Sequence, residues 1–123
     1  MIKFAKWITS PTDAKEAVYT YKKEFTLKGK VASAKLYASA IGVYTPVING
    51  ERIGKGILAP GWTSYKNRVQ YQEYDITDIL KADNTLEIGL GQGWAVGCIG
   101  VGHTNHVFAN YTSLIAAVEI NYA

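Results

Sequence analysis

Aromatic and polar side chains suited to sugar binding gather in segments that the sequence predicts to be loops. Binding residues concentrate on loops of a rigid scaffold, where aromatic faces stack on sugar rings and Asn or His side chains hydrogen-bond hydroxyl groups. The candidate carbohydrate site consists of Trp62, Tyr65, Trp94, Asn105 and His106, beside His103. The competing interpretation makes Trp62 and Trp94 buried anchors of glycine-rich loops, and the high average burial of Trp favours it.

One pair of acidic residues, Asp75 and Asp78, has a spacing that suits acid–base chemistry. Glycoside hydrolysis needs two carboxyl groups about 5 to 9.5 Å apart. The setting Tyr-Asp-Ile-Thr-Asp-Ile-Leu is instead typical of turn capping, in which Asp accepts backbone amide hydrogen bonds. We therefore expect a structural role for both carboxylates and no catalytic residue in this chain. Arg68 is expected to form a structural ion pair with one of them rather than to bind substrate.

The sequence offers little support for a metal site or for a catalytic nucleophile. His103 and His106 are three residues apart, but no helix is predicted there, and zinc normally takes at least three protein ligands. Cys98 is the single cysteine, so no intrachain disulfide can form, and no acidic residue orients a nearby histidine as a nucleophile would require. The residues indicate no metal site and no cofactor.

Length and charge limit the class of protein. The chain has 123 residues, 48% of them hydrophobic, which suits one globular domain. The net charge of +3 is small, and the basic residues are spread from Lys3 to Lys81, so nucleic acid is not an expected partner. No run approaches the roughly 20 apolar residues of a membrane span. Lys3 and Lys6 interrupt the first apolar residues, so we expect no signal peptide and a cytoplasmic location.

The elements that must position these residues are predicted to be β-strands. Residues 1–17 lack periodicity and are assigned to a lead-in segment, and residues 18–123 are assigned to a β-sandwich. Alternation of apolar and polar residues predicts strands at 18–27, 31–41, 68–74, 86–90 and 113–122, and residues 47–53 are predicted to form a hairpin. In the second strand, Ala34, Leu36, Ala38 and Ala40 face inward, and small inward residues imply bulky side chains opposite.

Residue types typical of turns predict the connections between these strands. Asn49-Gly50 predicts a two-residue hairpin turn, because a type I′ turn needs positive φ at both central positions. Thr77 is expected to cap a single helical turn. Residues 91–102 are expected to form an irregular glycine-rich loop. Residues 113–122, apolar on both faces up to Val118 and alternating thereafter, suggest a strand near a sheet centre.

The fold class that follows is all-β, a jelly-roll-like β-sandwich, although period-two patterning fits a closed barrel equally well. A barrel that binds single-stranded nucleic acid would need aromatic and basic residues on one sheet face. Tyr71 and Tyr74 fall on opposite faces of their strand, which argues against that alternative.

Eight short motifs support a family resemblance. They occur in this order: Tyr21-x-x-x-Phe25, Ala34-Lys35-Leu36-Tyr37, Gly42-x-Tyr44, Ile48-Asn49-Gly50, Leu58-Ala59-Pro60-Gly61-Trp62-Thr63-Ser64-Tyr65, Arg68-x-x-Tyr71, Tyr74-Asp75-Ile76-Thr77 and Gly91-Gln92-Gly93-Trp94. From about Trp7 to its end, the chain resembles the N-terminal accessory domain of bacterial α-L-rhamnosidases.

The resemblance implies a sandwich that precedes an (α/α)-barrel, which hydrolyses terminal α-L-rhamnosides with inversion. That barrel is absent from this chain, and the domain usually continues with an Asp-Gly turn and further strands, so we expect a sandwich truncated at its C-terminus. Some related modules resemble calcium-dependent rhamnose binders, which makes calcium the one ion that the resemblance brings in. Gln92 stands where family members often carry an acidic residue.

Two functions therefore remain open. The first is a module that recognises rhamnose-containing glycans for the parent enzyme. The second is a purely structural module that packs on the other domains of the parent and binds no ligand. We predict that Trp62 and Trp94 lie close together, because loops gather at the ends of a sandwich.

Overall fold

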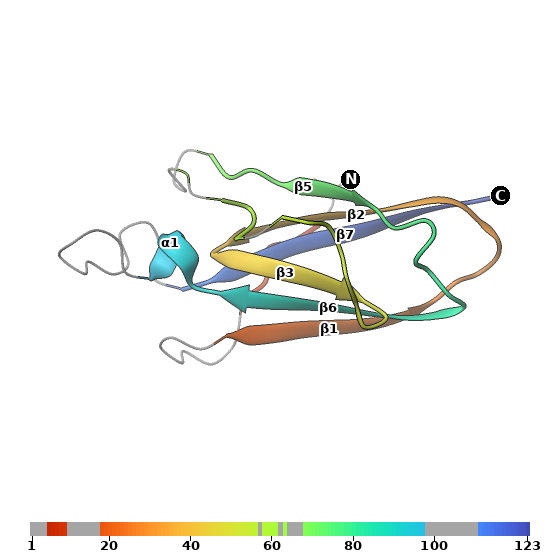
Figure 1. The fold of residues 1–123 in the computed structure, drawn as a ribbon, viewed down its shortest axis with the longest axis horizontal. Coiled ribbons are helices and arrows are strands. Elements are labelled where there is room, and N and C mark those ends of the chain that lie inside the picture. Colours follow the sequence, from red (N-terminus) through yellow and green to blue (C-terminus); the bar gives the residue numbers. More distant parts are fainter. Residues whose placement is uncertain (1–4, 10–17, 57, 62, 64–67, 98–110) are drawn as a thin grey trace.

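The computed structural model describes residues 5–9, 18–56, 58–61, 63, 68–97 and 111–123. In this part of the chain, two separate antiparallel sheets face each other as a β-sandwich (Figure 1). The larger sheet has the order β1-β6-β3-β4, with β1 (Tyr19–Thr26), β6 (Asp83–Gly91), β3 (Val43–Ile48) and β4 (Glu51–Arg52). The smaller sheet has the order β5-β2-β7, with β5 (Gln72–Asp75), β2 (Val31–Ile41) and β7 (Ser113–Tyr122). The all-β sandwich is confirmed, and its jelly-roll order stays a prediction.

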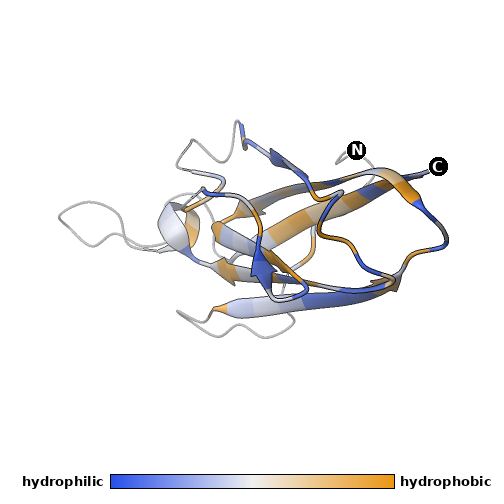
Figure 2. Ribbon diagram, turned by 45° about the vertical axis from the view of Figure 1, so that its right-hand side comes forward, coloured by the Kyte–Doolittle hydropathy of each residue, from blue (hydrophilic) through white to orange (hydrophobic). Residues whose placement is uncertain are grey.

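The core lies between the sheets, where the ribbon is most hydrophobic (Figure 2). Three of the four inward residues of β2 are alanines, and all four are buried: Ala34, Leu36, Ala38 and Ala40. Larger side chains of the other sheet fill the space opposite them: Tyr44, Ile48, Ile88 and Leu90. The inward placement of these four residues opposite bulky partners is confirmed, because the pleat sends every second side chain to the same face. The prediction of a half-buried strand was wrong in part, since Tyr37 and Ser39 on the other face are buried as well.

The hairpin turn is also confirmed. Asn49 and Gly50 have φ values of 53° and 81°, as a type I′ turn requires. Val47 pairs with Arg52 and Ile48 pairs with Glu51, so the turn has two residues. The Asn49 side chain adds a long-range link, because its amide donates a hydrogen bond to Asn84 Oδ1 at 2.9 Å.

Three further predictions about elements were wrong in part. Among the described strands, β7 pairs with β2 alone, and it therefore lies at the edge of the sheet β5-β2-β7 and not at its centre. On the side of β7 away from β2, Ile8 and Leu114 exchange two backbone hydrogen bonds of 2.8 Å. Strand β5 begins at Gln72 and not at residue 68, because the Ser39 hydroxyl donates to the carbonyl of Gln70 and replaces the strand ladder there.

The third difference is α1 (Gly93–Val96), a four-residue helix within the segment predicted to be an irregular loop. One helical turn is too short to produce a 3.6-residue pattern, so the sequence carries no periodic signal for it. Among the described helices, none has the length and hydrophobicity that a membrane span requires. The prediction for Tyr71 and Tyr74 is confirmed, since Tyr71 is exposed and Tyr74 packs against the core.

Candidate functional site

Helix α1 holds Trp94 at one end of the sandwich, and glycines let it approach the β2–β3 connection. Gly93 has a φ of 52°, and a Cβ there would lie 2.6 Å from Val43 Cγ1. Gly42 has a φ of 136°, and a Cβ there would collide with the carbonyl oxygen of Gly91. Only glycine fits these contacts, so the Gly91-Gln92-Gly93 motif positions the tryptophan that follows it.

The Trp94 side chain is half-buried. Its partners are the buried Ala95 and Val96, with Ile41 and Val69 at the edge of the same small cluster. This burial lies between the two predicted alternatives of an exposed platform and a fully buried anchor. Part of the Trp94 surface is therefore open to solvent on a well-supported helical turn.

The segment that leads to Trp62 is tied to the same region of the molecule. The amide of Tyr44 donates a hydrogen bond to the carbonyl of Ala59 at 2.8 Å, and Gly61 N–H donates to Leu58 O at 3.0 Å. The Ala59–Pro60 peptide bond is cis. Helix α1 packs on Gly42 and Val43, and Ala59 is hydrogen-bonded to Tyr44. The helix that carries Trp94 and the segment that leads to Trp62 are therefore both attached to residues 42–44.

Most residues of the predicted carbohydrate site lie outside the described part of the chain: Trp62, Tyr65, Asn105 and His106, together with His103 and Cys98. The predicted proximity of Trp62 and Trp94 therefore stays a prediction, supported by the shared anchor. Within the described residues, no three His, Cys, Asp or Glu side chains come together in a way that would hold a metal ion. The calcium dependence also stays a prediction.

Asp75 caps a turn, as predicted. Its Oδ1 accepts hydrogen bonds from the backbone N–H of Thr77 at 3.0 Å and from the Thr77 hydroxyl at 2.6 Å. The hydrogen bond from the Thr77 hydroxyl, followed by the one from its backbone N–H, lowers the pKa of Asp75 below its usual value. The Thr77 hydroxyl in turn accepts the backbone N–H of Ala34 at 3.0 Å and fastens the turn to β2. An ionised, exposed carboxylate with these partners is suited to structure rather than to proton transfer.

The ion pair predicted for Arg68 was wrong. The described ion pairs are Lys22–Glu24 and Lys35–Glu73, at 3.6 Å and 2.6 Å, and both are exposed. Arg68 is exposed on the segment that leads into β5, while Asp75 ends that strand. The two side chains are therefore at opposite ends of one extended stretch.

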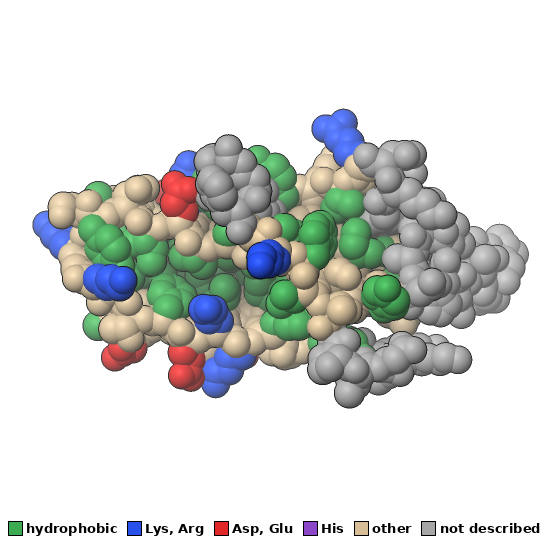
Figure 3. Space-filling view, turned by 180° about the vertical axis from the view of Figure 1, so that it is seen from behind, with side chains coloured by type: hydrophobic (Ala, Val, Ile, Leu, Met, Phe, Trp, Pro, Cys, Tyr) green, Lys and Arg blue, Asp and Glu red, His purple; other side chains and the backbone are tan. Residues whose placement is uncertain are grey.

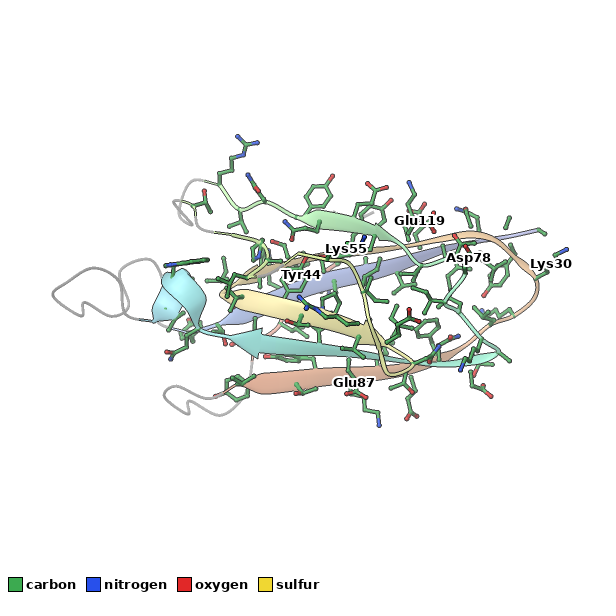
Figure 4. All side chains as sticks on the ribbon, in the orientation of Figure 1. Lys30, Tyr44, Lys55, Asp78, Glu87 and Glu119 are labelled. Carbon is green, nitrogen blue, oxygen red and sulfur yellow. The ribbon has the colours of Figure 1, made fainter. Side chains whose placement is uncertain are left out.

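Tyr44 is a functional candidate that sequence reasoning missed. Its buried hydroxyl lies 3.1 Å from Ala38 O, 2.5 Å from Gln72 Oε1 and 3.0 Å from Tyr74 Oη, between the two sheets (Figure 4). Burial, followed by the hydrogen bond to Tyr74, raises the pKa of Tyr44 above its usual value. This network closes the side of the sandwich where β3 faces β5, which we call the β3–β5 seam. The Gly42-x-Tyr44 motif was its only signal in the sequence.

The opposite side of the sandwich is open. A groove of about 610 Å³ runs between the edge strands β1 and β7, and we call it the β1–β7 groove. Its walls are mostly apolar and include Tyr21, Phe25, Leu86, Ile88, Val118 and Ile120. Seen from behind, apolar side chains gather in a hollow with lysine side chains at its margin (Figure 3). The groove could not be predicted from the sequence, because alternation does not reveal which strands lie at sheet edges.

Comparisons with known proteins agree with this architecture. Residues 29–123 match the family described as the α-L-rhamnosidase N-terminal domain. An α-L-rhamnosidase of Streptomyces avermitilis is 42% identical over 95 residues, which are 76% of this chain and 9% of that relative. An α-L-rhamnosidase of Formosa agariphila is 35% identical over 107 residues, covering 78% of this chain and 12% of the relative.

Solved structures show the same fold. The native α-L-rhamnosidase of Aspergillus terreus superposes with a TM-score of 0.91 and 32% identity, over 99% of this chain and 15% of that one. The Streptomyces avermitilis enzyme complexed with L-rhamnose gives a TM-score of 0.82 and 40% identity, over 88% of this chain and 10% of that one.

The fold, the family match and the small share of each relative that the chain covers define the class of protein. It is a small β-sandwich domain of the kind found in much larger glycosidases. The chain spans between 9% and 15% of the relatives that these comparisons name. It belongs to the family of α-L-rhamnosidase N-terminal domains.

Proposed function

We propose that this chain is a non-catalytic accessory domain that helps an α-L-rhamnosidase to recognise its substrate. Inverting hydrolysis of terminal α-L-rhamnosides would be carried out by a barrel domain elsewhere in the parent enzyme. The half-buried Trp94 on α1 is the observation that carries the proposal. An aromatic ring held rigidly at a sandwich end, with one part of its surface open, suits stacking on a sugar ring.

The family relation supplies the ligand class. A relative with the same fold has been solved in complex with L-rhamnose, and we therefore take L-rhamnose as the probe for this chain. The absence of catalysis in the isolated domain rests on Asp75, whose carboxylate is occupied by Thr77. The purified chain should release no aglycone from an aryl α-L-rhamnoside, and measurable release would contradict this part of the proposal.

Calorimetric titration with L-rhamnose, with and without calcium, tests the recognition role. Trp94→Ala should weaken binding at least about tenfold, while Trp94→Phe, which keeps an aromatic face, should retain most of it. Trp7, which is 47% exposed, provides the matched control, and Trp7→Ala should leave affinity unchanged. No heat of binding by the unmodified chain, or equal affinity of the Trp94→Ala variant, would reject the site.

A second function is favoured by a different observation. The β1–β7 groove exposes apolar surface on a domain whose relatives are much longer chains. In this alternative the domain is a structural unit that packs against other parts of the parent enzyme and binds no sugar. Rhamnose titration separates the two, because the structural alternative predicts no binding under any condition.

A further inference from the structure

We infer that Tyr71 forms a second sugar-stacking position beside Trp94, and that the ligand of this site is an oligosaccharide ending in α-L-rhamnose rather than rhamnose alone. This assignment rests on the proposed function, in which Trp94 binds the terminal rhamnose. Tyr71 would then stack on the sugar to which that rhamnose is attached.

Tyr71 places an exposed aromatic ring on the outer face of the smaller sheet. Glu73 pairs with Tyr37 of β2, whereas Gln72 contacts the Tyr44 hydroxyl between the sheets. Because alternate residues of an extended strand share a face, Tyr71 and Glu73 both face outward. Tyr71 is 54% exposed, so a large part of its ring can meet a ligand.

The Tyr71 ring is supported on one side by Tyr37. Its centroid lies 6.4 Å from that of the buried Tyr37 ring, and the two planes are tilted by 51°. Tilted pairs at this separation are favourable between aromatic rings. The backbone just before Tyr71 is fixed as well, because the Ser39 hydroxyl donates a hydrogen bond to the carbonyl of Gln70. A supported ring loses little conformational freedom when a sugar stacks on it, so Tyr71 is preorganised for binding.

Val69 links the position of Tyr71 to that of Trp94. It packs against Ala95 and Val96, the buried pair of α1 that also supports Trp94. Tyr71 follows Val69 by two residues, a separation of at most about 7 Å along the chain. Figure 1 shows α1 and the segment that leads into β5 at the same end of the sandwich. A rhamnose on Trp94 would therefore have its linked sugar within reach of Tyr71.

An exposed ion pair continues the outward row beyond Tyr71. Lys35 Nζ lies 2.6 Å from Glu73 Oε1, and both side chains are about half exposed. The ammonium group donates hydrogen bonds and the carboxylate accepts them, which suits the hydroxyl groups of a sugar. Because the two charges balance each other, this part of the face favours a neutral oligosaccharide.

Calorimetric titration of the 123-residue chain, with and without calcium, tests the second position. The ligands are methyl α-L-rhamnoside and two disaccharides, rutinose and neohesperidose, in which α-L-rhamnose is joined to glucose by different linkages. At least one disaccharide should bind about tenfold more tightly than methyl α-L-rhamnoside. Tyr71→Ala should remove that advantage and leave the affinity for methyl α-L-rhamnoside unchanged, while Tyr71→Phe should keep it. Tyr122, which is 41% exposed at the far end of β7, is the matched control, and Tyr122→Ala should alter neither affinity.

Equal affinity of the unmodified chain for all of these ligands would overturn the second position and leave the proposed function standing. So would a Tyr71→Ala variant that binds the disaccharides as tightly as the unmodified chain. An equal loss of affinity for methyl α-L-rhamnoside and for the disaccharides would also overturn it, because Tyr71 would then act only on the shape of the Trp94 site. No heat with any ligand would reject the proposed function together with this assignment.

Discussion

The two long sides of this sandwich are built in opposite ways. At the β3–β5 seam the sheets are joined by the Tyr44 hydroxyl, which contacts Tyr74, Gln72 and Ala38. At the β1–β7 groove the corresponding tyrosine, Tyr21, has a buried hydroxyl without a described partner, and the walls remain open. At the β3–β5 seam, the buried Tyr44 hydroxyl has its hydrogen-bond partners within the domain. The open side instead combines apolar walls with a buried hydroxyl that has no partner among the described residues.

The largest expected effect belongs to Gly54, on the closed seam. Its φ is 77°, and an added Cβ would lie 2.7 Å from Tyr74 Cε1, on a ring whose hydroxyl is bonded to Tyr44. Gly54→Ala should therefore lower the free energy of unfolding by about 3 kcal/mol, from backbone strain and from overpacking together. Urea denaturation measures this loss.

Two other glycines separate the causes. Gly50 has a φ of 81° but open space around it, so Gly50→Ala should cost only about 1 kcal/mol, the part due to positive φ. Gly56 has open space and no positive φ, and Gly56→Ala should change stability by less than about 0.5 kcal/mol. Equal losses at Gly54 and Gly50 would mean that Tyr74 is not held in place by the seam.

A pair of identical substitutions compares the two sides directly. Tyr44→Phe should destabilise the chain by about 1 to 3 kcal/mol, because Tyr74 and Gln72 lose a buried partner. Tyr21→Phe should be neutral or slightly stabilising, because it removes a buried hydroxyl that has no described partner. Chemical denaturation of both variants under the same conditions is the measurement. Similar losses of unfolding free energy would remove the distinction between the β3–β5 seam and the β1–β7 groove.

Much of the sandwich was predictable from the sequence for a simple reason. A strand with one buried face alternates its residue types, so β2 and the Asn49-Gly50 hairpin carry their own signals. Position within a sheet has no such signal. Apolar residues on both faces of β7 suggested a central strand, but they belong to an edge strand that borders the groove.

The candidate site was less predictable. The residue types around Trp94 suggested sugar binding, whereas its half-burial depends on Val69 and Ile41, which are distant in sequence. The Tyr44 network likewise joins residues 28 and 30 positions apart. Contacts between strands of different sheets depend on tertiary packing, which one-dimensional periodicity does not encode.

The smallest expected effect is a pH dependence at the end of β5. Hydrogen bonds from Thr77 lower the folded-state pKa of Asp75, so its stabilisation is present above the unfolded value of 3.8. This contribution is lost as the pH falls from there through the lower folded-state pKa. Asp75→Asn should flatten this part of the stability curve, as followed by urea denaturation between about pH 2 and 6. An unchanged slope in the variant would show that Asp75 does not titrate differently on folding.

A nuclear magnetic resonance titration with L-rhamnose tests the central claim most directly, because it reports binding residue by residue. The proposed function predicts shifts of the Trp94 indole N–H and of the Gly93 and Ala95 amides, which lie on α1. The amides of Ala116 and Val118, in the open groove, should not move. Shifts confined to the groove, or no shifts at all with or without calcium, would contradict a sugar-recognition role for this end of the sandwich.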